Sequence, residues 1–127
     1  MSHGKKHILL IEEEPVLADI TGFRLELLGH TVQRLASAEE ALVWLGDQLP
    51  NLVVIGHFLP GMDGIDFLNR ISNDVRTSDI PTILLSPNSE LDDVQRAFNA
   101  GADEYLVTPF DPRTLEQKVE RLMAIES

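Results

Sequence analysis

Short apolar segments alternate with longer amphipathic segments along the whole of this 127-residue chain. The segments at 7–11, 31–35, 52–55, 81–86 and 104–107 have the length and composition of strands. Each is followed by helical periodicity or by helix-capping residues. Strands that alternate with helices pair in parallel through right-handed crossovers. The sequence therefore predicts an α/β fold, with a five-stranded parallel sheet as the middle layer of a three-layer (βα)5 sandwich.

The expected helices are indicated by apolar spacing and by end signals. After Pro15, four apolar side chains recur at i, i+4, i+7 and i+11, the pattern of an amphipathic helix that packs on a core: Val16, Ile20, Phe23 and Leu27. Ser37 and Glu40 form a capping box for a second helix. A third is expected from Asp63 to Asn73, a fourth over 90–100 before Gly101, and a last one from Pro112, capped by Asp111.

Composition narrows the function classes. We expect a single domain over residues 1–127. Its formal charge of −11 makes nucleic acid and anionic membranes poor partners. Cysteine is absent, which excludes disulfides and thiolate chemistry. No apolar run approaches the roughly 18 residues that span a bilayer, and "MSHGKKH" leads into a strand without a signal-peptide segment. A cytoplasmic location is the expectation.

Chemistry in open α/β sheets is found at the carboxyl ends of the strands. The loops after the first, third, fourth and fifth strands should meet at one edge of the sheet. They carry Glu12, Glu13 and Glu14; Gly56, His57 and Phe58; Ser86 and Pro87; and Thr108 and Pro109. No phosphate-binding glycine loop and no GxSxG pattern is present, so nucleotide binding and serine hydrolysis lack support.

Five motifs follow one another along the chain in a characteristic order and spacing: "ILLIEEEP", "LPGMDGIDFL", "PTILLS", "AGADEYLVTPF" and the "DP" before the last helix. In these motifs the chain resembles the receiver domain of two-component response regulators, whose fold is flavodoxin-like. The resemblance implies phosphoryl transfer from a histidine kinase to an aspartate after the third strand. It also implies Mg²⁺ on an acidic pair after the first strand, with a Ser or Thr and a Lys binding the phosphoryl oxygens.

Transferred residue by residue, the resemblance exposes departures. Pro60 places the acceptor position at Gly56, and Pro109 with Phe110 places the lysine position at Thr108. Neither residue can do the expected chemistry. The acidic pair becomes Glu12 and Glu13, each one methylene longer than the usual aspartates. Ser86 matches the hydroxyl position, but Pro87 follows it and has no N–H to donate.

These departures predict a degenerate pseudo-receiver that is not an enzyme and is not phosphorylated. It would act as a phosphorylation-independent interaction module in a phosphorelay. Its partner would be a histidine kinase, a regulator or an output domain, or a second copy, docking on residues 90–125. The resemblance also implies a switch-like pair, Ser86 with Tyr105, and a cis peptide bond before Pro109.

Other interpretations stay open. No cofactor is required, although Glu12 and Glu13 leave room for a weak Mg²⁺ site. The emptied pocket could bind a small molecule, or an unusual residue could accept phosphate, with His57 and Ser86 the less favoured candidates. The chain could also be one module of a longer protein. His3, His7, His30 and His57 lack the spacing of a zinc site, and Asp92 with Asp93 suits a helix N-terminus.

Overall fold

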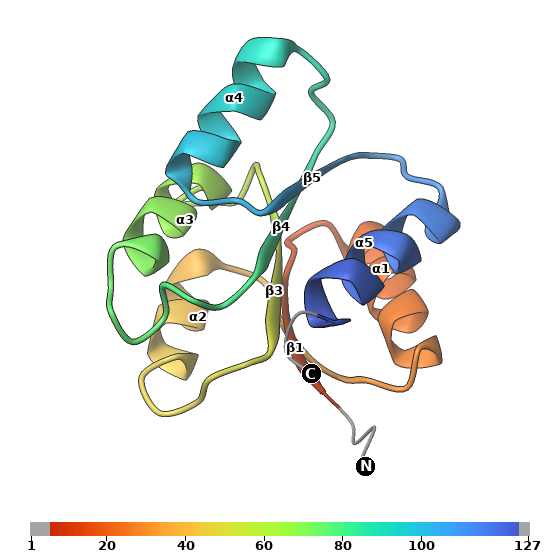
Figure 1. Ribbon diagram of the computed structural model, residues 1–127, viewed down its shortest axis with the longest axis horizontal. Coiled ribbons are helices and arrows are strands. Elements are labelled where there is room, and N and C mark those ends of the chain that lie inside the picture. The colour runs from red at the N-terminus through yellow and green to blue at the C-terminus, as the bar shows by residue number, and fades with distance from the viewer. Residues whose placement is uncertain (1–5, 125–127) are drawn as a thin grey trace.

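The computed structural model describes residues 6–124, which form one five-stranded parallel sheet. The order across the sheet is β2-β1-β3-β4-β5, so β3 is central and β2 and β5 are the edges (Figure 1). The strands are β1 His7–Ile11, β2 Thr31–Leu35, β3 Leu52–Gly56, β4 Thr82–Ser86 and β5 Glu104–Val107. The predicted sheet and fold class are confirmed, and His3 and residue 125 lie outside the described residues.

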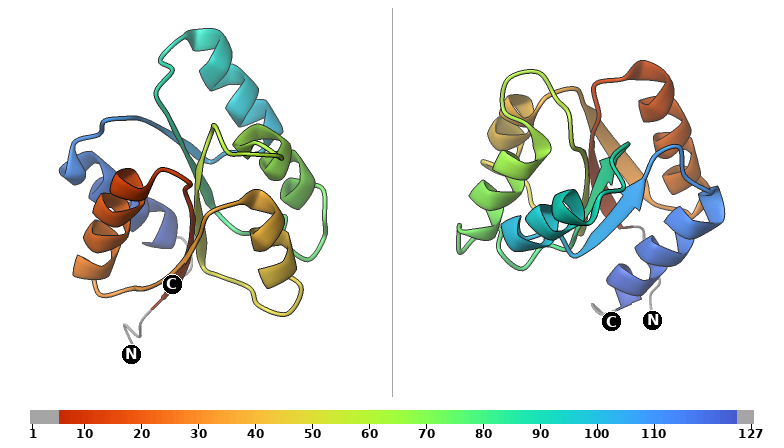
Figure 2. Two further views of the ribbon diagram at one scale, coloured as in Figure 1. Left: turned by 180° about the vertical axis from the view of Figure 1, so that it is seen from behind. Right: turned by 90° about the horizontal axis from the view of Figure 1, so that it is seen from above.

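A helix follows every strand. The helices are α1 Pro15–Leu27, α2 Ala38–Trp44, α3 Gly64–Ser72, α4 Leu91–Ala100 and α5 Pro112–Ala124. Helices α1 and α5 cover one face of the sheet, and α2, α3 and α4 cover the other (Figures 1 and 2). The three layers are therefore those expected from the alternation of strands and helices.

Two apolar clusters, one on each face of the sheet, hold the layers together. Side chains alternate between the faces along each strand. In β3, Leu52 and Val54 join the cluster under α1 and α5, whereas Val53 and Ile55 join the cluster under α2, α3 and α4. All five residues of β3 are buried, as are all five of β4. This double burial explains their continuous apolar sequences.

The helix ends follow the sequence signals. The Ser37 hydroxyl accepts the Glu40 N–H at 3.1 Å, and Asp63 caps α3 through the Asp66 N–H at 2.9 Å. Helix α4 ends at Gly101, whose φ of +119° lies in the left-handed region that glycine adopts without strain. Asp92 and Asp93 lie in the first turn of α4, where carboxylates offset the helix dipole.

The prediction that the apolar row of α1 packs on the core is wrong. Val16, Ile20, Phe23 and Leu27 do share one face, but each is 47–63% exposed. The side that packs on the sheet carries Thr21, Gly22 and Leu25 instead. Gly22 leaves room for the Arg34 side chain of β2, since a Cβ on Gly22 would lie 2.5 Å from Nε of Arg34. In α4, Phe98 is likewise 44% exposed, whereas Ala97 is buried.

Within residues 6–124, no helix has both the length and the apolar character needed to cross a bilayer.

Candidate functional site

The carboxyl ends of β1, β3, β4 and β5 lie next to one another at one edge of the sheet. Register pairs Ile11 with Ile55, Gly56 with Leu85, and Ser86 with Val107. The residues that follow these strands therefore meet, as the sequence predicts. Two close contacts organise the edge: one joins Glu12 to Gly56, and the other joins His57 to Ser86.

The Glu12 carboxylate lies where a side chain on residue 56 would begin. A Cβ placed on Gly56 would be 2.5 Å from Oε1 of Glu12 and 3.2 Å from its Cδ. Both distances are shorter than ordinary van der Waals contact. Glycine at this position leaves the space that the longer glutamate fills. The extra methylene of Glu12 and the missing side chain of Gly56 are thus complementary.

Burial raises the pKa of the Glu12 carboxyl above its usual value. The side chain is only 8% exposed, and desolvation is the largest cause of the shift. Backbone N–H groups of Glu14 and Glu13 oppose that shift, and the Glu14 N–H donates to Oε2 of Glu12 at 3.0 Å. Repulsion from the neighbouring glutamates contributes less than burial does.

The other two glutamates have different surroundings. Glu14 caps α1: its carboxylate accepts the Leu17 N–H at 2.8 Å and the Val16 N–H at 3.3 Å. Glu13 is exposed. Among residues 6–124, no group of three His, Asp or Glu side chains could hold a metal ion. Because Gly56 offers no carboxylate and Glu12 is turned into its space, the residues present do not fit the Mg²⁺ site that the resemblance implies.

His57 is a buried participant at this edge. Its side chain is 4% exposed, and Nδ1 lies 2.9 Å from the Ser86 hydroxyl oxygen. Burial lowers the pKa of the His57 imidazole. His57 thus lies in the loop after β3 but is buried, unlike most loop residues. Alternation does turn it away from Gly56, but it turns it toward Ser86 on the neighbouring strand.

The residues after β4 and β5 are joined by their backbones. The Thr108 N–H donates to the Ser86 carbonyl at 2.9 Å, which places the lysine position beside the hydroxyl position. The peptide bond between Thr108 and Pro109 is cis. After Pro87, the next backbone N–H belongs to Asn88 and donates to the Ser86 hydroxyl oxygen at 3.1 Å.

Tyr105 points inward. It is 9% exposed, packs in the cluster under α2, α3 and α4, and donates its hydroxyl to the Asn88 carbonyl at 2.8 Å. The sequence motifs identify Tyr105 and Ser86 but not Asn88, which contacts both. Its signal is positional: it is the first residue after Ser86 with an N–H.

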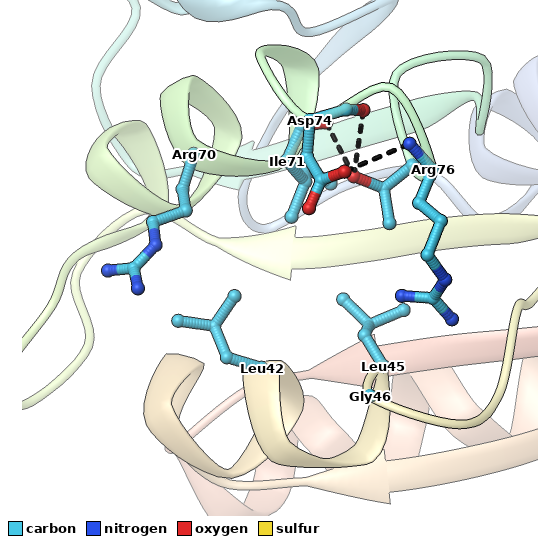
Figure 3. A pocket seen from close by; sticks show the side chains of 8 residues that line it. Leu42, Leu45, Gly46, Arg70, Ile71, Asp74 and Arg76 are labelled. Carbon is cyan, nitrogen blue, oxygen red and sulfur yellow. Dashed lines mark hydrogen bonds between the residues drawn. The ribbon is translucent and has the colours of Figure 1, made fainter.

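A cavity of about 250 Å³ lies between α2 and α3 (Figure 3). Leu42 and Ile71 line its apolar part, and Arg70 and Arg76 flank it. These segments end the two helices and lead toward the start of β3 and β4. The cavity therefore lies near the amino ends of the strands, whereas Gly56 lies at the carboxyl end of β3. It does not belong to the candidate site.

Comparison with known proteins finds a family model and relatives that agree with one another. Residues 8–120 match the family model described as response regulator receiver domain. The chain is 31% identical to the DNA-binding dual master transcriptional regulator RpaA of Synechocystis over 91% of this chain and 48% of that protein. It is 32% identical to the phosphate regulon transcriptional regulatory protein PhoB of Pseudomonas aeruginosa, over 94% of this chain and 51% of that protein.

A solved relative agrees in three dimensions. A putative response regulator from Chloroflexus aurantiacus superposes with a TM-score of 0.92 at 29% identity, covering 95% of this chain and 99% of that one. The chain spans about half the length of the curated relatives it matches. From its family match, its relatives and its sheet order, this chain belongs to the response regulator receiver domain family.

Proposed function

We propose that this receiver domain does not accept a phosphoryl group and acts as a phosphorylation-independent interaction module in two-component signalling. The observation that carries the proposal is the position of Glu12. Its carboxylate lies 2.5 Å from the point where a side chain on residue 56 would start. The acceptor position thus lacks a nucleophile, and a neighbouring side chain occupies its space.

The phosphoryl-binding groups are altered in the same direction. Thr108 brings no cation to the site, and Pro87 brings no N–H. Phosphoryl transfer depends on positioning and on neutralisation of charge by metal and cations. A buried carboxylate without a metal site or a lysine beside it opposes the approach of a phosphate.

The surface around β5 offers a place for a partner. Leu91, Phe98 and Val107 are exposed apolar side chains on α4 and β5. Beside them, Glu104 accepts from Lys118 at 2.8 Å and from Arg121 at 2.9 Å, so β5 and α5 are tied together. This combination of apolar and charged groups suits docking of a kinase, a regulator, an output domain or a second copy.

The alternative of a small-molecule sensor has less support, because the space beside Gly56 holds the Glu12 carboxylate. A phosphorelay receiver with an unusual acceptor has less support as well. The Nδ1 atom of His57 already contacts the Ser86 hydroxyl. The two candidate acceptors are therefore hydrogen-bonded to each other.

Restoring the missing groups tests the proposal. The variants are Gly56→Asp with Thr108→Lys, and the same pair with Glu12→Asp. Each is incubated with acetyl phosphate and Mg²⁺, and its intact mass is measured. We expect weak labelling of the first variant because Glu12 obstructs the new aspartate, and more labelling of the second. Pro87 should still keep the second below a normal receiver. Full labelling of the first variant would show that Glu12 and Pro87 are no obstacle.

A further inference from the structure

Four residues, from the loops after β3 and β4 and from the strands β4 and β5, form one continuous chain of hydrogen bonds. Nδ1 of His57 lies 2.9 Å from Oγ of Ser86. The same Oγ accepts the Asn88 N–H at 3.1 Å, and the Asn88 carbonyl accepts the Tyr105 hydroxyl at 2.8 Å. The chain runs from the end of β3, through the loop between β4 and α4, to β5.

Three of its four members are buried, and Asn88 is half-buried. Ser86 is fully buried, His57 is 4% exposed and Tyr105 is 9% exposed. The Phe58 ring stacks on the imidazole, with ring centroids 4.1 Å apart and planes inclined by 12°. A buried hydroxyl or imidazole nitrogen that loses its partner carries an uncompensated desolvation cost. The arrangement is therefore favoured as a unit.

The direction of the first bond follows from the protons available. Oγ of Ser86 already accepts the Asn88 N–H and has one hydrogen of its own to donate. Within the described residues, Nδ1 of His57 is the acceptor in reach of that hydrogen. With its proton on Nε2, the imidazole accepts this hydrogen at Nδ1, and every hydrogen bond of the chain is made.

We propose that His57 is the positioning residue that orients Ser86 and, through Asn88, holds Tyr105 inward. This inference rests on the proposed function, because it assigns to a side chain of the domain the control that a phosphoryl group would otherwise exert. The surface made by α4, β5 and α5 then keeps one arrangement without phosphorylation. Gly56 takes no part in this chain, so the two contacts at the site have separate roles.

The test compares His57→Leu, which cannot accept a hydrogen bond, with His57→Asn, whose side-chain oxygen can replace Nδ1. His30→Leu is the matched control, since His30 is a partly buried histidine outside the chain of hydrogen bonds. Tyr105 is the sole tyrosine, so its ring gives unambiguous NMR signals. We expect His57→Leu to shift these signals and the Asn88 amide, and to speed hydrogen exchange at Asn88 about fivefold, the factor for one lost hydrogen bond.

His57→Asn should restore both readouts, and His30→Leu should change neither. Ser86→Ala breaks the same chain at its second member and serves if His57→Leu does not fold. In the native protein, the imidazole ¹⁵N shifts should report the Nε2–H tautomer. Unmoved Tyr105 and Asn88 signals in folded His57→Leu, or the Nδ1–H tautomer in the native protein, would overturn the proposal. All these measurements are made without a phosphate donor, so a failure of the proposed function would appear separately, as phosphorylation of the native chain.

Discussion

Glu12 and Gly56 share one space at the edge of the sheet, with Oε1 of the glutamate 2.5 Å from the position of a Cβ on the glycine. A long carboxylate after β1 and a missing side chain after β3 are thus one structural feature. The pair explains why a scaffold suited to a reactive residue carries glycine at its centre. It also gives the pair a measurable energetic signature.

A methyl group on residue 56 should cost less when Glu12 is shortened, because Oε1 of Glu12 must otherwise move. We expect Gly56→Ala to lower the free energy of unfolding by roughly 1–3 kcal/mol, the usual cost of overpacking. In a Glu12→Ala background the same change should cost less. The entropy change from glycine to alanine in the unfolded chain is the same in both backgrounds and cancels. Urea unfolding of the four proteins measures the coupling, and strict additivity would contradict the shared space.

The buried Glu12 carboxyl should make stability depend on pH. Its pKa is raised in the folded protein, so the folded state binds its proton more tightly than the unfolded state, whose value is near 4.5. Stability from this group is therefore full below pH 4.5 and falls as the pH rises toward the folded pKa. Glu12→Gln should flatten that part of the profile. A Glu13→Gln control, at an exposed residue, should leave the slope in place.

His57 should act in the opposite direction at higher pH. Burial lowers its pKa below the ordinary 6.5, although Asp63 and Asp93 raise it and Arg96 adds to the lowering. The unfolded chain then takes up a proton first as the pH falls. Stability should decline from pH 6.5 downward until the folded pKa is passed. Burial also lowers the pKa of His30, so urea unfolding of His57→Asn across this range should show a smaller decline rather than none. A decline equal to that of the native protein would assign all of it to His30 or another group.

The outward row on α1 should be nearly free of energetic consequence. Phe23 is 56% exposed, whereas Leu25 is fully buried. We expect Phe23→Ser to change the free energy of unfolding by less than about 0.5 kcal/mol. Leu25→Ala should cost about 2–5 kcal/mol. Thermal and urea unfolding distinguish the two, and a large loss in Phe23→Ser would place that row in the core.

The fold was predictable because its signals are redundant. In β3 the run Leu52 to Ile55 indicates burial on both faces, and Gly101 and Pro112 mark helix ends independently of any packing. The orientation of α1 was not predictable in the same way. Two faces of that helix have helical spacing. The face with the larger apolar side chains, such as Phe23, is exposed, and the face with Thr21 and Gly22 is buried. The choice depends on tertiary packing, such as the contact of Gly22 with the Arg34 side chain of β2, which helical spacing does not encode.

The candidate site was likewise predictable only in part. Strand ends and family motifs identify Glu12, Gly56, Ser86 and Tyr105. What those residues do to one another depends on distances of an ångström, such as the reach of one extra methylene in Glu12. The position of the buried His57 follows from the strand pattern. Alternation along β3 excludes it from the side of Gly56, and the parallel register with β4 then places it beside Ser86.

Whether this domain accepts a phosphoryl group is tested most directly by adding Mg²⁺ and then acetyl phosphate to the native protein while recording amide NMR spectra and intact mass. We expect no added phosphoryl mass, and shifts that are absent or confined to Glu12 and Glu13. A phosphorylated species whose shifts extend to Tyr105 and α5 would contradict it.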